Sequence, residues 1–194
     1  MKISFIIPSR NNLKYLKWCY NSLRKNVSSL HQICVADDAS DDGTWAWCES
    51  IMSKDSNFNA ICNNGPDRLG LTILYDKLIS EVAINDVVML YHADMYACPN
   101  FDKYVEKYLK PGTVVCLTRV EPPLHPPGPE KIILDMGIEP DDFKEDLFLL
   151  WFSEQKDKFS GKITNGVFAP WAIYKSDFNK VNGHDPLFAP QSKE

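Results

Sequence analysis

Short apolar runs recur along the chain, and their spacing predicts its secondary structure. Runs rich in β-branched or aromatic residues predict buried strands at 3–7, 32–36, 59–62, 87–90 and 113–120. Apolar residues at helical spacing predict helices at 16–27, 45–52, 71–82, directly after residue 100, and at about 141–156. Strands that alternate with helices need crossover connections. The pattern therefore predicts an α/β fold with a mostly parallel sheet covered on both faces.

The chain beyond residue 120 has a different pattern. The segment EPPLHPPGPEK (121–131) contains five prolines, which excludes regular structure within it. One apolar helix is expected next, followed by a tail rich in loops. With 194 residues, 44% of them hydrophobic, the chain can bury one sizeable core. We therefore expect a single domain over residues 1–194.

Charge and cysteine spacing narrow the classes of partner and compartment. The net charge of −5, without a cluster of lysine and arginine, argues against nucleic acid or an anionic membrane as the main partner. The six cysteines are scattered and never spaced C-x-x-C, so neither a zinc knuckle nor a disulfide framework is indicated. No apolar run reaches signal-peptide or membrane-spanning length. A soluble, cytoplasmic protein with no integral membrane segment is expected.

Polar strings follow each of the first four predicted strands. They are PSRNN (8–12), DDASDDGT (37–44), NNGPDRLG (63–70) and HADMY (92–96). Open α/β sheets bind ligands at the carboxyl ends of their strands, where loops diverge and helix N-termini point inward. These four strings should therefore meet at one edge of the sheet and form the site.

The first of these strings excludes several nucleotide-binding classes. PSRNN contains no glycine, whereas a dinucleotide-binding fold needs G-x-G-x-x-G there and a P-loop enzyme needs G-x-x-x-x-G-K-[ST]. A nucleotidyl transferase that activates sugars also needs a glycine-rich loop at this point. A metal ion is therefore the expected counter-charge for any bound phosphates.

Taken together, the strings resemble a known family. SFIIPSRNNLKYLKWCYNSL, ICVADDASDDGT and HAD are similar to the strings VSVIIPTYN, VVDDGSTDGT and DAD of the inverting family 2 glycosyltransferases, which have the GT-A fold. The resemblance covers residues 3–102, and the tail DFNKVNGHDPLFAPQSKE is similar to the family's GGFDE…ED segment. It implies a GT-A-like, Rossmann-like sheet flanked by helices. About 1–110 would form the nucleotide-sugar-binding half and about 111–194 a loop-rich acceptor half, truncated at the Glu-Asp motif.

The resemblance assigns the nucleotide pocket to the first two strand ends. Pro8, Ser9 and Arg10 would line it, and Asp38, with Asp37 as second choice, would accept a hydrogen bond from the base of a UDP-, GDP- or dTDP-sugar.

Two alternatives concern the polar strings after the second and third strands. The acidic string could instead only cap the helix that follows, through Ser40 or Asp41. Arg68, in the third string, would either bind a phosphate of the donor or be a solvated surface arginine.

The family's Asp-x-Asp motif corresponds to His92, Ala93 and Asp94. Its last carboxylate holds Mn²⁺ or Mg²⁺ against the sugar-nucleotide diphosphate, and Asp94 matches that ligand. His92 departs from the pattern. Its imidazole would bind the metal directly, donate to the ribose or a phosphate, or position Asp94, although a single strand-end histidine is more often structural. Ala93 would line the donor site between them.

The acceptor side and the catalytic base fall to the second half. Glu194 matches the glutamate of the family's Glu-Asp pair, so the base is Glu194 or an aspartate just beyond it. Trp171 offers an aromatic face that would stack on an acceptor sugar, although a core position is the more common one for a tryptophan. The acceptor would be a hydroxyl of a glycan, or of a lipid-linked or protein-linked saccharide.

The expected function is a metal-dependent, inverting sugar transfer in polysaccharide biosynthesis. Any association of the protein with a membrane would be peripheral and would occur through its acceptor. Two rival classes remain open. One is a catalytically inactive module that binds a sugar nucleotide or glycan. The other is a nucleotidyl transferase on a similar sheet, against which the glycine-free first loop argues.

Overall fold

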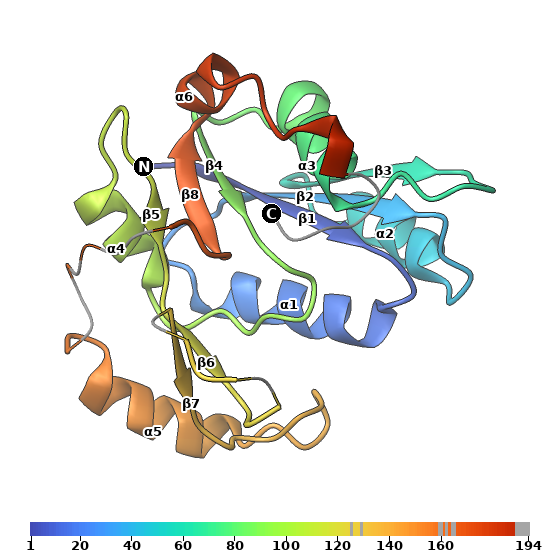
Figure 1. The fold of residues 1–194 in the computed structure, drawn as a ribbon. Helices are drawn as coiled ribbons and strands as arrows, with labels where there is room; N and C mark the ends of the chain where they lie inside the picture. The colour runs from blue at the N-terminus through green and yellow to red at the C-terminus, as the bar shows by residue number, and fades with distance from the viewer. Residues whose placement is uncertain (125, 129, 159–160, 162, 164–165, 189–194) are drawn as a thin grey trace.

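The protein has three layers, with helices on both faces of a six-stranded sheet (Figure 1). The computed structural model describes residues 1–124, 126–128, 130–158, 161, 163 and 166–188. The strand order is β3-β2-β1-β4-β8-β5, and a separate sheet pairs β6 with β7. The strands are β1 (Ile3–Ser9), β2 (Gln32–Asp38), β3 (Phe58–Asn63), β4 (Val87–Leu90), β5 (Val115–Cys116), β6 (Arg119–Glu121), β7 (Lys131–Ile133) and β8 (Trp171–Tyr174).

The first four strands of the chain form the parallel part of the sheet, as predicted. β1 pairs with β2 on one side and with β4 on the other, and β2 pairs with β3. Every residue of β1, β2 and β4 is buried. Burial on both faces explains why these strands read as apolar runs without alternation. β8 runs antiparallel to β4, and β5 runs antiparallel to β8, so the sheet is mixed at one side.

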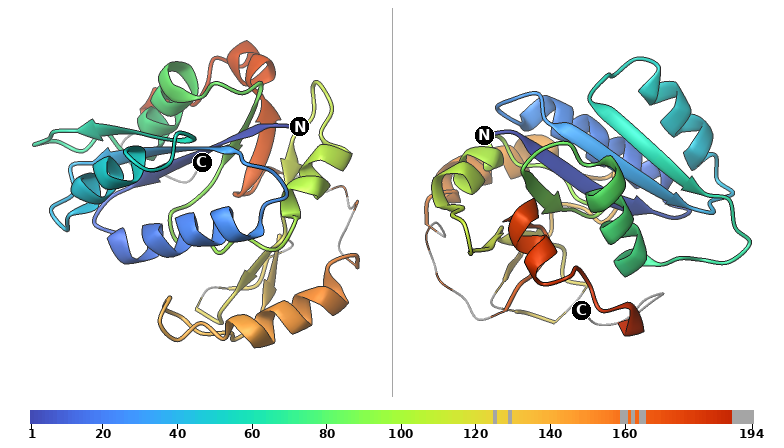
Figure 2. Two further views of the ribbon diagram at one scale, coloured as in Figure 1. Left: turned by 180° about the vertical axis from the view of Figure 1, so that it is seen from behind. Right: turned by 90° about the horizontal axis from the view of Figure 1, so that it is seen from above.

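Helices cover the two faces through separate apolar clusters. α1, α2 and α4 pack on one face, where Leu16, Cys48 and Val105 are almost fully buried. α3, the π-helical turn that continues it, and α6 pack on the other face, and Figure 2 shows both layers from two further directions. No helix in the described part of the chain is long and apolar enough to cross a bilayer. The helices are α1 (Leu13–Asn26), α2 (Thr44–Met52), α3 (Leu71–Lys77), the π-helical turn (Leu78–Val82), α4 (Phe101–Tyr108), α5 (Glu145–Gln155) and α6 (Lys175–Lys180).

The order of the strands creates a switch point between β1 and β4. The chain passes from β1 to β2 on one side, and later returns to the other side of β1 as β4. The β1–β4 ladder ends at the pair Ile6 and Leu90, whereas β1 continues alongside β2 to Ser9. Open α/β sheets bind their ligands at such a point, outside the carboxyl ends of the strands. The fold therefore places the candidate site where β4 ends beside β1.

The second half adds a small layer below α1. β6 and β7 form a parallel ribbon that brackets the proline-rich segment, and α5 lies along this ribbon in Figures 1 and 2. Charged side chains link the ribbon across its strands: Arg119 bonds to Glu130 at 3.1 Å and Lys131 bonds to Glu121 at 2.9 Å. Among the described residues of 121–131, the prediction that no regular structure occurs is wrong at the two end residues, Glu121 and Lys131.

Several predicted elements need correction. The strand expected at 113–120 is split between the two sheets, because the chain leaves the main sheet after Cys116 and pairs in the ribbon from Arg119. The tail expected to be rich in loops contains β8 and α6. The helix expected from residue 141 begins at Glu145, and the helix expected at 71–82 changes from α to π geometry after Lys77.

Candidate functional site

The end of β1 brings Pro8, Ser9 and Arg10 to the switch point. Pro8 lacks an N–H, which is tolerated because β4 has ended and no ladder partner remains on that side. The Ser9 hydroxyl is buried and has no hydrogen-bond partner among the described residues, so it remains available to a ligand or a water. The Arg10 guanidinium donates to the backbone carbonyl of Asp38 at 2.9 Å and thereby joins the ends of β1 and β2.

Asp38, at the end of β2, is 3% exposed and holds the loop that follows β3. Its carboxylate accepts hydrogen bonds from the Leu69 N–H and the Gly70 N–H, both at 3.0 Å, and from the Asn63 amide at 2.8 Å. Burial alone would raise the pKa of Asp38, but these hydrogen bonds outweigh it and lower the pKa. Arg68 is carried by the same loop, and its Nε lies 3.9 Å from this carboxylate. Asp38 therefore holds the backbone of the loop that carries Arg68.

Both aspartates of β2 are already hydrogen-bonded in this structure. Asp37 is 1% exposed and accepts the Ser40 N–H at 3.2 Å, with the Cys62 thiol 3.9 Å away. Since the oxygens of Asp38 already accept three hydrogen bonds, an incoming base N–H must share one oxygen or displace part of the loop.

The acidic string after β2 also organises the start of α2, but not through Ser40 or Asp41, the residues named in the capping alternative. Asp42 accepts hydrogen bonds from the N–H and the hydroxyl of Thr44, at 3.1 and 2.6 Å. Its other oxygen accepts the Leu13 N–H at 2.8 Å. Asp42 therefore ties the first turn of α2 to the first turn of α1, while Ser40 and Asp41 bond to the loop after β1.

His92, Ala93 and Asp94 follow β4 at the same edge. Ala93 is buried, His92 is partly buried, and the side chain of Asp94 is exposed. The His92 carbonyl accepts a hydrogen bond from the Met95 N–H at 3.4 Å. It also accepts the thiol of Cys19 on α1, whose sulfur lies 3.6 Å away. These contacts close a turn around Asp94, whose carboxylate faces solvent.

Few side chains at this edge of the sheet could act as metal ligands. Within the described residues, no three His, Cys, Asp or Glu side chains gather in a way that could hold a metal. Asp94 offers one exposed carboxylate, and His92 is its neighbour across Ala93. Mg²⁺ sites of enzymes commonly use one or two carboxylates and complete the coordination with substrate phosphates and water. The residues present therefore fit a cation that binds together with a diphosphate.

Trp171 lies at the same end of the sheet, because it begins β8 directly opposite Leu90 of β4. Its ring centroid is 6.5 Å from that of His184, which also stacks on Tyr75 at 5.7 Å. His184 Nδ1 is 2.7 Å from an oxygen of Asp76 on α3, and the His184 N–H donates to the other oxygen at 3.1 Å. The segment after α6 is thereby anchored to α3 beside Trp171.

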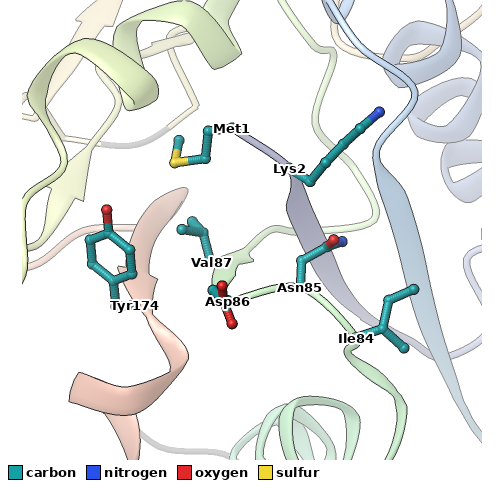
Figure 3. A pocket seen from close by; sticks show the side chains of 7 residues that line it. All are labelled: Met1, Lys2, Ile84, Asn85, Asp86, Val87 and Tyr174. Atoms are coloured by element: carbon teal, nitrogen blue, oxygen red, sulfur yellow. The ribbon is translucent and has the colours of Figure 1, made fainter.

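An open pocket of about 300 Å³ occurs at the opposite edge of the sheet (Figure 3). It adjoins the amino ends of β1 and β4 and the last residue of β8, away from the strand ends that carry the candidate site residues. It therefore has no part in the candidate site. Its lining residues are Met1, Lys2, Ile84, Asn85, Asp86, Val87 and Tyr174.

The structure thus brings most of the predicted site residues to one edge of the sheet. The exception is Glu194, which lies outside the described residues. Sequence reasoning missed that Trp171 belongs to a strand of the main sheet, and that Asp38 anchors the loop carrying Arg68. The β-branched and aromatic residues of WAIY were a signal for the strand, but four residues are too few to separate it from a loop.

Comparisons with known proteins agree with this architecture. A fragment of TarS from S. aureus (residues 1–349, in complex with UDP) matches with a TM-score of 0.67 and 16% identity, over 97% of this chain and 51% of that chain. The mannosyltransferase PcManGT from Pyrobaculum calidifontis, in complex with GDP-Man and Mn²⁺, matches with a TM-score of 0.59 and 15% identity, over 95% and 48%. GalNAc-T7 with UDP, GalNAc and Mn²⁺ matches with a TM-score of 0.63 and 14% identity, over 96% and 37%. The chain spans about half the length of the TarS fragment.

These likenesses confirm the predicted α/β, GT-A-like fold. No curated protein sequence matches the chain. The sequence model described as glycosyl transferase family 2, however, matches residues 4–181, which include the strand ends at the switch point and Trp171. The chain therefore belongs to glycosyl transferase family 2.

Proposed function

We propose that this protein transfers a sugar from a nucleoside-diphosphate sugar to a hydroxyl of a saccharide acceptor, with inversion and with the help of Mn²⁺ or Mg²⁺. The observation that carries the proposal is the placement of Ser9, Asp38 and Asp94 at one switch point of a family 2 fold. Related folds crystallised with UDP, with GDP-Man and Mn²⁺, and with UDP, GalNAc and Mn²⁺ support this class of donor.

Donor binding is assigned to the first half. The buried Ser9 hydroxyl has an unused hydrogen-bonding capacity that a nucleoside can satisfy. Asp38 accepts a hydrogen bond from the N–H of a uracil, thymine or guanine base through an oxygen that also accepts a hydrogen bond within the protein. Asp37 is the second choice for this role. Arg68 is 42% exposed, and it can turn from Asp38 toward a phosphate. Pro8, Arg10 and Ala93 form the walls of this donor site.

The chemistry at the sugar requires two further functions. A divalent cation held by Asp94, with His92 as a direct or indirect partner, would neutralise charge that develops on the departing diphosphate. A carboxylate base must accept the proton of the attacking hydroxyl on the opposite face of the sugar. We assign this base to Glu194 or to an aspartate that follows it in a longer chain.

Acceptor recognition is assigned to the second half. Trp171 lies beside the end of β4, where its ring can stack on a sugar bound next to the donor. A glycan, or a lipid-linked or protein-linked saccharide, fits this placement, and polysaccharide biosynthesis is the corresponding process. We propose a cytoplasmic protein that approaches a membrane only through such an acceptor.

Calorimetry and thermal shift with UDP-, GDP- and dTDP-sugars, with and without Mn²⁺, test the donor assignment. At least one donor should bind, and binding should strengthen in Mn²⁺. Asp94→Ala should abolish the metal-dependent part, whereas Asp86→Ala, which removes an exposed aspartate at the opposite edge, should leave it unchanged. Metal-dependent binding that survives Asp94→Ala would rule out the metal assignment.

A transfer assay separates an enzyme from an inactive binding module. The 194-residue form should bind donor but transfer sugar slowly, and a form extended beyond Glu194 should be faster. If the 194-residue form turns over fully and Glu194→Gln removes this activity, Glu194 itself is the base. Donor binding without transfer in either form, across a panel of saccharide acceptors, would instead identify a sugar-nucleotide-binding module.

A further inference from the structure

The loop that carries Asp94 is tied along one face of α1. Cys19 contacts the His92 carbonyl at 3.6 Å, the Ser22 hydroxyl accepts the Ala97 N–H at 2.9 Å, and the Asn26 amide donates to the Ala97 carbonyl at 2.8 Å. Residues three and four apart on a helix share a face, so these ties form a continuous row. In Figure 1 the loop leaves β4, passes α1 and leads to α4.

Tyr96 extends this row to the acceptor half. Its hydroxyl donates to Glu145 Oε1 at 2.6 Å and accepts a hydrogen bond from the Asn26 amide at 3.0 Å. Glu145 is the first residue of α5. The Tyr96 ring also contacts Phe143 and Phe148, with centroid distances of 4.8 and 5.8 Å. One side chain of the Asp94 loop is therefore held by both α1 and α5.

The ionised carboxylate of Glu145 favours this contact. The Lys25 ammonium and the Tyr96 hydroxyl lower the pKa of Glu145, so its carboxylate stays ionised. A phenol that donates to a carboxylate is a charge-assisted hydrogen bond, which is stronger and more directional than a neutral one.

A second hydrogen bond of the same kind lies near the other end of α5 and serves as an internal control. The Tyr104 hydroxyl, on α4, donates to Asp157 Oδ1 at 2.7 Å, just beyond the last residue of α5. Both tyrosines attach the α5 region to the rest of the protein. Only Tyr96 lies within the loop that carries Asp94, two residues from that carboxylate.

We infer that Tyr96 is a positioning residue that couples α5 of the acceptor half to the metal-binding loop of the donor half. The inference rests on the proposed function, because it assigns Tyr96 a role in setting the position of Asp94. A movement of α5 when an acceptor binds would be transmitted through Glu145 and Tyr96 to Asp94. Donor binding in the presence of the metal and acceptor binding should therefore depend on each other.

The test compares Tyr96→Phe with Tyr104→Phe, since each removes one phenol hydroxyl and one hydrogen bond to a carboxylate. By calorimetry, Tyr96→Phe should weaken Mn²⁺-dependent donor binding about tenfold and leave metal-free nucleotide binding unchanged. Tyr104→Phe should change neither. Glu145→Gln keeps an acceptor oxygen without the charge and should lie between Tyr96→Phe and the wild type.

Amide hydrogen exchange provides a readout that does not depend on the donor. Tyr96→Phe should speed exchange in residues 92–97, including the Ala97 N–H, whereas Tyr104→Phe should not. Equal effects of the two variants on donor binding, or unchanged exchange in Tyr96→Phe, would overturn the inference. If no donor binds to the wild type in Mn²⁺, the proposed function fails and the assigned role of Tyr96 fails with it. If donor binds and only the Tyr96 effect is absent, the proposed function stands without this role.

Discussion

The two halves of the chain differ in how they use polar and apolar side chains. In the proposed donor half (about 1–110), every residue of β1 and β2 is buried, and Asp38 is enclosed by the backbone N–H groups of Leu69 and Gly70. In the proposed acceptor half (about 111–194), α5 leaves Leu147 and Leu150 more than half exposed. The first half therefore has its polar groups fixed inside a packed frame, whereas α5 of the second half presents apolar side chains to solvent.

This difference fits the two kinds of recognition that we propose for the halves. A nucleoside diphosphate has a fixed shape and charge, so a rigid set of strand ends with oriented hydrogen-bonding groups suits it. Loops placed on such a rigid frame carry the variable part of recognition in many folds. The contrast predicts that changes in the donor half will reduce both stability and donor binding, and that comparable changes in the acceptor half will be tolerated.

The largest effect is expected for Asp38→Ala. The change leaves the N–H groups of Leu69 and Gly70 without their acceptor in a buried or partly buried position, and it removes one of the two acceptors of the Asn63 amide. Unsatisfied buried donors cost about 1–3 kcal/mol each when nothing replaces the acceptor, so we expect a loss of about 3 kcal/mol in the free energy of unfolding. Urea denaturation measures this loss, and calorimetry should show that nucleotide binding is lost with it.

The matched change in the acceptor half is Asp142→Ala. Asp142 also holds a loop, since it accepts the N–H groups of Ile138 and Glu139 at 3.0 and 2.7 Å, but it is exposed. Water can replace its oxygens, and we expect a loss below about 1 kcal/mol. Equal losses for Asp38→Ala and Asp142→Ala would contradict the contrast between the halves.

The next effect concerns the acid stability of the donor half. Asp102 is 4% exposed and bonds to His31 Nε2 at 2.9 Å and to the Ser28 N–H. His31 Nδ1 accepts a hydrogen bond from the Ile3 N–H, so the ring proton is on Nε2, which donates a hydrogen bond to Asp102. Burial alone would raise the pKa of Asp102, but these hydrogen bonds lower it to about 2.

A carboxyl group whose pKa is lower in the folded than in the unfolded state stabilises the protein at pH values above its unfolded-state pKa. This contribution is lost as the pH falls through the folded-state pKa. For Asp102 the window lies between about pH 4 and pH 2. Asp102→Asn should therefore cost on the order of 2 kcal/mol at pH 7, and its difference from the wild type should shrink below pH 4. Thermal unfolding from pH 2 to pH 7 measures this, and a difference independent of pH would contradict it. Asp177→Asn in the acceptor half should have a smaller effect.

A smaller change is expected for the choice of metal. If His92 coordinates the cation, His92→Asp should shift preference from Mn²⁺ toward Mg²⁺ by several-fold, because Mg²⁺ prefers oxygen ligands and imidazole suits later transition metals better. Donor binding titrated with each ion gives the ratio of the two affinities. An unchanged ratio would exclude direct coordination and leave His92 with a role toward the ribose, a phosphate or Asp94.

The contrast between the halves also explains what could be read from the sequence. β1, β2 and β4 are buried on both faces, so their apolar runs identify them without knowledge of their partners. The convergence of Ser9, Asp38 and Asp94 follows from the rule for carboxyl ends of parallel strands. Those parts of the fold and of the candidate site were predictable.

The acceptor half was less predictable because tertiary pairing decides its strands. β5 has two residues and β8 has four, and each depends on a partner far along the chain. The hydrogen bonds of Asp38 to the loop after β3, and of Tyr96 to α5, likewise join residues 25–49 positions apart, which no local pattern reveals. Local propensity could not identify these contacts.

The smallest effect is expected on the outer face of α5. Leu150 is 60% exposed, and Leu147, one turn earlier on the same face, is 52% exposed. Replacing Leu150 by glutamine removes little buried apolar area, and glutamine has a helix propensity close to that of leucine. We therefore expect a change below about 0.5 kcal/mol in the free energy of unfolding, measured by urea denaturation. A loss above about 1 kcal/mol would show that this face packs against another part of the protein or against a second copy. The acceptor half would then share the buried character of the donor half.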